Sequence, residues 1–150
     1  MSFTENLKQH GGKALLLGII NAVLLSVIMV PVFRAGISPM PEPPSLAFAQ
    51  TLLGRPLPLP VGLLFHVVYV AFWSVVFVAA VYPQLTFLRA AGLGLILWVI
   101  VLVVFFPIIG WGLLGLGVSP ALIVASLIPH ILFTVFLWGL GRLMFRRISS

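Results

Sequence analysis

The sequence has very little charge, no cysteine and no aspartate. Only 7% of its 150 residues are charged and 62% are hydrophobic, whereas soluble domains contain about 25% charged residues. This composition excludes a soluble globular fold, and a chain so apolar is not intrinsically disordered either. The absence of cysteine excludes disulfides, thiolate metal sites and cysteine nucleophiles.

Acidic residues are nearly absent, and both glutamates lie outside the long apolar runs. Because Glu5 and Glu42 are the only carboxylate side chains, no carboxylate is expected within the membrane, which argues against a typical cation-coupled carrier. The net charge of +6 comes from eight basic residues. They are scattered at the ends of apolar segments rather than gathered in a dense stripe, so nucleic acid is not an expected partner.

Four apolar runs are each long enough to cross a membrane, which takes about 20 residues as a helix. Helices are expected because lipid cannot satisfy open backbone N–H and C=O groups. The first run exceeds the apolar region of about 7–15 residues in a cleaved signal peptide, so we expect a retained helix. The sequence therefore predicts an all-α integral membrane four-helix bundle, with residues 1–150 forming one transmembrane domain. The expected helices span about 14–33, 61–82, 91–116 and 120–145.

The connection between the first two spans, residues 34–60, holds seven of the twelve prolines. After the prolines, residues 45–54 read as a short helix that Ser45 caps and Gly54 ends. Leu46, Ala49 and Leu53 fall on one side at helical spacing, so we expect this helix to lie at the outer membrane interface. An ordinary exposed loop is the alternative.

Basic residues are distributed unevenly between the two sides of the predicted bundle. Arg34 and Arg55 fall on one side, and six fall on the side of the termini: Lys8, Lys13, Arg89, Arg142, Arg146 and Arg147. Since basic residues accumulate in cytoplasmic loops, both termini are predicted to be cytoplasmic. Anionic lipid headgroups are expected near Arg142, Arg146 and Arg147.

Small residues recur at every fourth position in the first span, at Gly18, Ala22 and Ser26. Such a face allows helices to pack closely in lipid, and Asn21 beside it is expected to donate a hydrogen bond to another helix. In the third span, Pro107 is expected to kink or unwind the helix, and Trp111 to anchor it at the outer interface.

Polar side chains gather at similar depths in the second and fourth spans. His66 and Tyr69 share one helical face, while Ser126 and His130 lie one turn apart on the other helix, in a stripe that continues through Thr134 and Trp138. Because polar groups avoid lipid, His66, Tyr69, Ser126 and His130 are predicted to form a polar cluster inside the bundle.

Four interpretations of this cluster are open. The histidines can be structural, hydrogen-bonded to their neighbours. They can be two axial ligands of haem b, since His66 and His130 lie on different helices of a bundle. They can line a passage for a proton or small solute. Catalysis is disfavoured, because the HExxH and GxSxG motifs are absent and Ser126 and His130 lack an acidic partner. Apart from the haem alternative, no metal or cofactor is expected.

The order of these features resembles the YagU-like family of small four-helix bacterial inner-membrane proteins. The resemblance covers about residues 18–141 and rests on helix order together with Gly54, His66, Pro107 and His130, in the segments SLAFAQTLLGRPLPLP, GLLFH, FFPIIG and PHILFTVFLWGLG. It implies a location in the bacterial inner membrane and supplies no reaction.

These observations favour a non-enzymatic membrane protein that acts as an accessory or assembly-type subunit. Its small-residue faces and scarce soluble mass suggest a homo-oligomer or a larger membrane complex as its context. The alternatives are a bis-histidine haem-binding electron-transfer subunit and a small channel or carrier.

Overall fold

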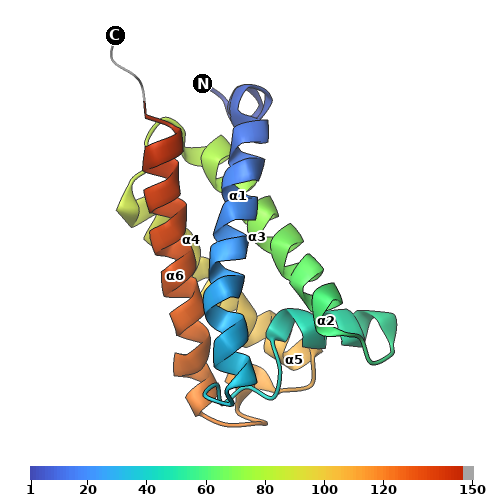
Figure 1. Cartoon of the computed structure of the whole chain (residues 1–150). Coiled ribbons are helices and arrows are strands. Elements are labelled where there is room, and N and C mark those ends of the chain that lie inside the picture. The colour runs from blue at the N-terminus through green and yellow to red at the C-terminus, as the bar shows by residue number, and fades with distance from the viewer. Residues whose placement is uncertain (147–150) are drawn as a thin grey trace.

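The structure is a computed structural model that describes residues 1–146, all of whose regular elements are helical. Four helical segments are long and apolar enough to cross a membrane, and they stand side by side with a short helix lying across one end (Figure 1). The elements are α1 (Phe3–Arg34), α2 (Pro44–Leu53), α3 (Leu59–Val81), α4 (Phe87–Ile100), the π-helical turn η1 (Val101–Phe105), α5 (Phe106–Ile108), the 3₁₀ turn η2 (Leu113–Gly115) and α6 (Ala121–Met144). The predicted all-α bundle with a short helix between its first two spans is therefore confirmed.

Helix α1 begins at Phe3 rather than near residue 14. A capping box explains the early start, because the Ser2 hydroxyl accepts a hydrogen bond from the Glu5 N–H and the Glu5 carboxylate accepts one from the Ser2 N–H. A helix of 32 residues is about 48 Å long, against about 30 Å for the hydrocarbon core of a bilayer. The first turns of α1 therefore extend beyond the apolar part of the bundle.

The third span breaks near Pro107, as the sequence predicts, but it does not continue to residue 116. Proline has no N–H to donate, and the preceding Phe106 N–H bonds to Val101 O in a π-helical turn. The regular helix ends at Ile108, and positive φ angles at Gly110 and Gly112 then turn the chain. The expectation that Trp111 anchors the interface is wrong, because this side chain is only 7% exposed and packs on Phe106.

The short helix α2 ends at Gly54 as predicted, in a left-handed conformation with φ of 64°. Ser45 does not cap its start, because the helix already begins at Pro44, with Pro43 as the preceding residue. Its buried side chains are Leu46, Ala47 and Ala49, whereas Leu53 is 50% exposed.

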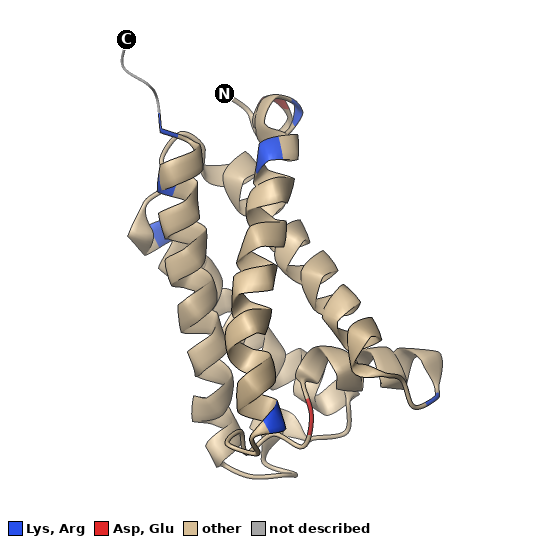
Figure 2. Cartoon of the chain, viewed as in Figure 1, with Lys and Arg blue, Asp and Glu red and all other residues tan. Residues whose placement is uncertain are grey.

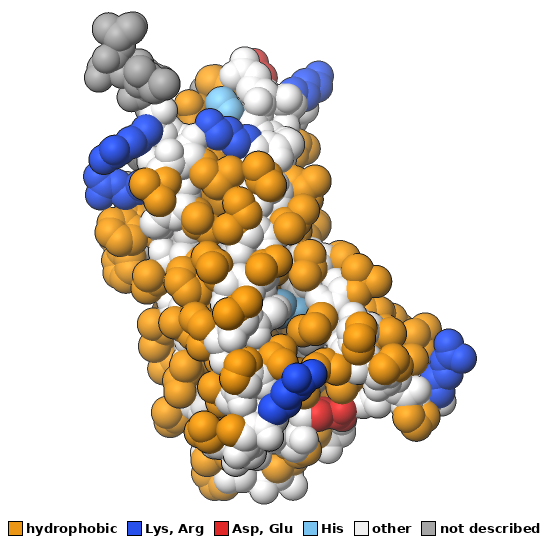
Figure 3. Space-filling model, viewed as in Figure 1, with side chains coloured by type: hydrophobic (Ala, Val, Ile, Leu, Met, Phe, Trp, Pro, Cys, Tyr) orange, Lys and Arg blue, Asp and Glu red, His pale blue; other side chains and the backbone are white. Residues whose placement is uncertain are grey.

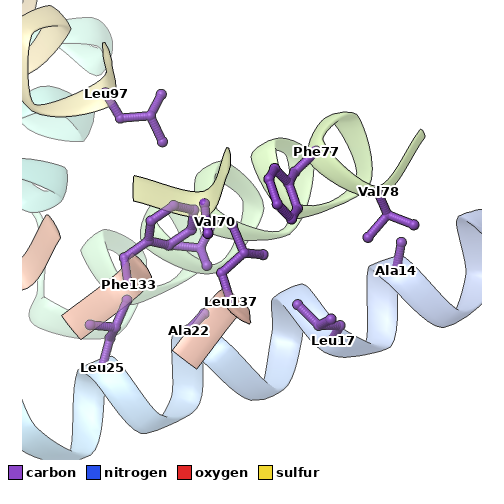
Figure 4. Close-up of a cluster of buried hydrophobic side chains, with 11 residues drawn as sticks. Ala14, Leu17, Ala22, Leu25, Val70, Phe77, Val78, Leu97, Phe133 and Leu137 are labelled. Carbon is purple, nitrogen blue, oxygen red and sulfur yellow. The ribbon is translucent and has the colours of Figure 1, made fainter. Parts of the chain in front are cut away.

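Helices α1 and α3 approach most closely at Gly18. A Cβ atom added there would lie 2.5 Å from Ala71 Cα and 2.9 Å from Ser74 Cβ, so only glycine permits this approach. Figure 4 shows Ala14 of α1 against Val78 of α3, further along the same contact. The small-residue face predicted from the sequence therefore packs inside the molecule.

The other residues of that face behave differently from one another. Ala22 is completely buried, and the Asn21 side-chain amide donates to Phe133 O of α6 at 3.2 Å, which is the interhelical bond that the sequence predicts. Ser26 is only partly buried and donates to Ala22 O within its own helix. The close packing thus ends one turn before Ser26.

Replacing Ala22 with leucine is expected to lower the free energy of unfolding by about 1–3 kcal/mol, since overpacking a filled site forces its neighbours apart. Replacing Val23 with leucine should change it by less than about 0.5 kcal/mol, because Val23 is 50% exposed. Denaturant titration of both variants in detergent measures the difference. Equal tolerance of the two changes would contradict the tight packing at Ala22.

Residues at the N-terminal end of α1 hold it to the end of α3. The buried Asn6 side chain donates to Ala79 O at 3.0 Å and to Tyr82 O at 3.4 Å, carbonyls that the end of a helix leaves without partners. The His10 ring stacks on Tyr82, with 4.0 Å between centroids. Hydropathy does not single out Asn6 or His10 as packing residues, because both precede the apolar run.

Charged residues lie at the two ends of the bundle (Figure 2). Helix α1 begins and α6 ends at the same end (Figure 1). Arg142, at that end, lies over the Trp138 ring, 5.6 Å from its centroid. Arg147, one of the residues expected to meet anionic headgroups, lies outside the described residues.

Candidate functional site: a cavity between α1 and α3

A cavity of about 430 Å³ lies where α1 and α3 diverge. The two helices are in contact around Gly18 and separate toward the end of the bundle at which α2 lies (Figure 1). Residues of α1, α2, α3, η1 and α6 contribute to its wall. Its volume is within the range of about 300–1,000 Å³ that is usual for small-molecule sites.

The wall of this cavity is overwhelmingly apolar. Leu25 and Met29 of α1, Phe48 of α2, and Val101 and Phe105 of η1 are among its lining residues. No lysine, arginine, aspartate or glutamate lines it among the described residues. A charged molecule would therefore lose its hydration there without gaining a counter-ion, so the site suits an uncharged and largely apolar molecule.

The four polar residues singled out in the sequence all line this one cavity: His66, Tyr69, Ser126 and His130. The fold brings them together because α3 and α6 face each other across the space that α1 leaves open. His66 and Tyr69 belong to α3, and Ser126 and His130 belong to α6.

The His130 ring is fixed by its own helix. Its Nδ1 atom lies 2.7 Å from Ser126 O, and because a carbonyl oxygen can only accept, Nδ1 carries the hydrogen. Nε2 of the neutral ring is then a free acceptor. Pro129, the residue before it, removes one N–H from the helical ladder at this point. The Ser126 carbonyl thus fixes the orientation of the imidazole and leaves Nε2 available to a ligand.

Ser126 is occupied by structural hydrogen bonds. The Trp98 indole N–H donates to Ser126 Oγ at 3.1 Å and to Ile123 O at 3.2 Å, and the Ser126 hydroxyl itself donates to Ile123 O at 3.1 Å. This network joins α4 to α6. Ser126 is therefore a less available ligand than the sequence suggests, and Trp98 is a packing residue that hydropathy alone does not reveal.

Tyr69 and His66 give the α3 side of the cavity its polar groups. The Tyr69 ring packs edge-on against Phe105 and Trp73, with centroid distances of 5.6 Å and 6.4 Å. Its buried hydroxyl makes no hydrogen bond of acceptable geometry among residues 1–146, although the Trp73 indole lies close to it. The His66 ring lines the same cavity one turn earlier on α3. An unpaired buried polar group costs about 1–3 kcal/mol, so a ligand that pairs with these groups would be stabilised.

The cavity opens sideways, toward what would be lipid. Val68 and Phe72 line it and are 62% and 57% exposed. Figure 3 shows a hollow on this face with a histidine inside it, surrounded by hydrophobic side chains. A molecule dissolved in the bilayer could therefore enter without crossing a polar surface.

A second, smaller cavity of about 290 Å³ adjoins the first at the α2 end. Val30, Phe33, Met40 and Pro43 line both. Charged residues appear only in the smaller one, whose wall includes Arg34 and Glu42, so the polarity of the cavities rises toward the end of the bundle.

Within residues 1–146 no group of three or more histidine, cysteine, aspartate or glutamate side chains could hold a metal ion. The fold and the cavity thus define a helical protein suited to multiple membrane crossings, with an apolar intramembrane site that has a polar wall. Comparison with models of protein families, with characterised proteins and with solved structures gives no match to this chain. The resemblance to YagU-like proteins stays a prediction.

Proposed function

We propose that this protein is a small, non-enzymatic, multi-pass membrane protein whose cavity binds a lipophilic molecule that enters from the bilayer. The observation that carries the proposal is the cavity of about 430 Å³, which combines an apolar wall, a lateral opening and unpaired polar atoms. Ligand-binding pockets typically combine an apolar lining with a few placed polar groups.

An accessory role beside a larger membrane complex is part of this proposal. Most of the described residues lie in helices, and four of the helical segments are long enough to cross a membrane, which leaves little soluble mass for an independent reaction. Because the face around Gly18 and Ala22 is used inside the molecule, a partner subunit or second copy would contact the large apolar side chains on the outside of the bundle. A non-enzymatic role is supported by Ser126, whose hydroxyl is already bonded to Trp98 and Ile123.

Filling the cavity tests the proposal. Met29 lines the cavity, whereas its neighbour Ile28 is 40% exposed on the outside of α1. We expect Met29→Trp to reduce binding of 11-bromoundecan-1-ol at least tenfold, measured by native mass spectrometry of protein released from detergent micelles, because the indole occupies the site. Ile28→Trp is the matched control and should bind as the wild type does. Absence of saturable binding to the wild type would overturn the proposal.

Haem b is a second candidate, favoured by one observation. His66 and His130 line the same cavity from different helices, and the His130 ring is oriented with Nε2 free, as an axial ligand requires. Against it, no cationic side chain among the described lining residues would pair with the two propionates. A Soret band in purified protein that His66→Ala and His130→Ala both abolish would select haem over an apolar ligand.

We further propose a bacterial inner-membrane location with both termini in the cytoplasm, which the six-to-two distribution of basic residues supports. In cells, we expect a cysteine at the exposed Thr4 to be shielded from a membrane-impermeant maleimide and a cysteine at the exposed Arg55 to react. Arg55 suits this test better than Gln50, whose side chain bonds to Glu42 and to the Leu57 N–H. Labelling of Thr4→Cys from outside would overturn the orientation.

A further inference from the structure

We infer that the polar wall of the cavity selects a neutral lipid with an uncharged oxygen headgroup, either a carbonyl or a hydroxyl. This inference rests on the proposed function, since it specifies which lipophilic molecules the cavity takes. Two sources share this chemistry: isoprenoid quinones with their quinols, and long-chain alcohols.

The apolar wall and the lateral opening determine where the tail lies. Phe72 and Val68 at the opening are exposed, and residues such as Leu25 and Phe105 continue the apolar surface inward. A hydrocarbon or isoprenoid tail can therefore run from the cavity into the surrounding lipid, without polar atoms to satisfy along its length.

The polar wall determines the headgroup. The Tyr69 hydroxyl has no partner and can donate or accept. The His66 ring also lines the cavity, and an imidazole offers one donor and one acceptor when it is neutral. His130 offers only an acceptor, Nε2, because its Nδ1–H is bound to Ser126 O. A carbonyl oxygen would accept from Tyr69 or His66, and a hydroxyl could in addition donate to His130.

Charge excludes the commoner membrane lipids from this position. His66 lies seven residues beyond Leu59, the start of α3, which is about 10 Å along the helix. A phosphate or an ammonium group at that depth would need a counter-ion, and the described lining residues include none. A phospholipid could place an acyl chain in the cavity, but it would leave the Tyr69 hydroxyl and the His66 ring unpaired.

The test compares probes that differ only at the headgroup. We would measure binding of 11-bromoundecan-1-ol, of a benzoquinone with a ten-carbon tail, and of 1-bromododecane, which has no oxygen, to the full chain in detergent by native mass spectrometry. The wild type is expected to bind at least one oxygen-bearing probe about tenfold more tightly than 1-bromododecane, as one or two hydrogen bonds would give.

The decisive variant is Tyr69→Phe, with Tyr82→Phe as its matched control. Tyr82, the other tyrosine of the chain, follows the opposite end of α3 and does not line the cavity. We expect Tyr69→Phe to weaken the oxygen-bearing probe about three- to tenfold and to leave 1-bromododecane unchanged, whereas Tyr82→Phe should change neither. Because Tyr69→Phe removes an unpaired hydroxyl, the variant should fold at least as stably as the wild type.

The possible outcomes separate this inference from the proposed function. If no probe binds the wild type saturably, the proposed function fails and the inference fails with it. If 1-bromododecane binds as tightly as the oxygen-bearing probes, or Tyr69→Phe affects none of them, the inference alone is overturned. A preference for the quinone or for the alcohol supports the inference and identifies the source of the ligand.

Discussion

Replacing Gly18 with alanine is expected to lower the free energy of unfolding by about 3 kcal/mol, at the upper end of the usual cost of overpacking. The added Cβ atom would lie 2.5 Å from the Cα atom of Ala71. Because the obstacle is backbone rather than a flexible side chain, α1 and α3 must move apart along their whole contact. Reversible unfolding in mixed micelles, followed by Trp fluorescence or circular dichroism, measures the loss.

Gly12 supplies the control within the same helix. A Cβ atom there meets nothing within 4 Å, so Gly12→Ala should be neutral or should stabilise the protein by up to about 1 kcal/mol through helix propensity. Opposite signs at Gly18 and Gly12 are the expected result. If Gly18→Ala is as well tolerated as Gly12→Ala, the close approach of α1 and α3 is not present in the folded protein.

Replacing Gly62 with alanine is expected to detach α2 from α3. A Cβ atom at Gly62 would lie 2.6 Å from Leu46 Cβ and 2.8 Å from Leu46 Cα, and α2 is short enough to move away as a unit. We expect a loss of about 1–3 kcal/mol in the packing of α2. Because Phe48 of α2 lines the cavity, a bound lipophilic probe should also dissociate at least tenfold faster.

Hydrogen–deuterium exchange of the peptide covering residues 44–53 reports on this detachment directly. Gly139→Ala in α6 is the control, since its added Cβ atom meets nothing within 4 Å and should leave exchange in α2 unchanged. Unaltered exchange in α2 of the Gly62→Ala variant would show that α2 does not depend on this contact.

Most of the fold could be predicted from the sequence because it follows from local properties of the chain. The length of each apolar run gives the spans, and the missing N–H of Pro107 gives the break in the third span. The spacing of Gly18 and Ala22 indicates a close helix contact. Each signal acts within a few residues, so no tertiary information is needed to interpret it.

Other features depend on neighbours that hydropathy cannot identify. Asn6 belongs to a polar segment of the sequence. It is a packing residue because the end of α3 lies beside it and Ala79 O accepts a hydrogen bond from its side chain. In the sequence, Trp98 is one more apolar residue in a long apolar run. In the structure, its indole N–H donates a hydrogen bond to Ser126 Oγ at 3.1 Å. The expectation for Trp111 fails for the same reason, since the turn after Ile108 carries it back onto Phe106.

Part of the candidate site could likewise be predicted from the sequence, and part of it could not. Polar residues at matching depths in two spans, as at His66 and His130, suggest that they face each other. No local sequence pattern predicts the cavity itself. It arises from the angle between α1 and α3 and from the position of α2 across their open end. Phe105 lines it only because the π-helical turn changes the register of the residues before Pro107.

The contact at Gly18 fixes the angle at which the second half of α1 diverges from α3 (Figure 1). On one side of Gly18, α1 is held to α3 by the Asn6 hydrogen bond and by Ala14, which packs against Val78 (Figure 4). On the other side its remaining 16 residues, to Arg34, extend about 24 Å. They diverge from α3 and stay packed on α6, where the Asn21 side chain donates to Phe133 O. A change of about 5° in the angle between α1 and α3 would displace the Arg34 end of α1 by about 2 Å. The width of the cavity therefore depends on the contacts at Asn6 and Gly18, two residues that do not line it.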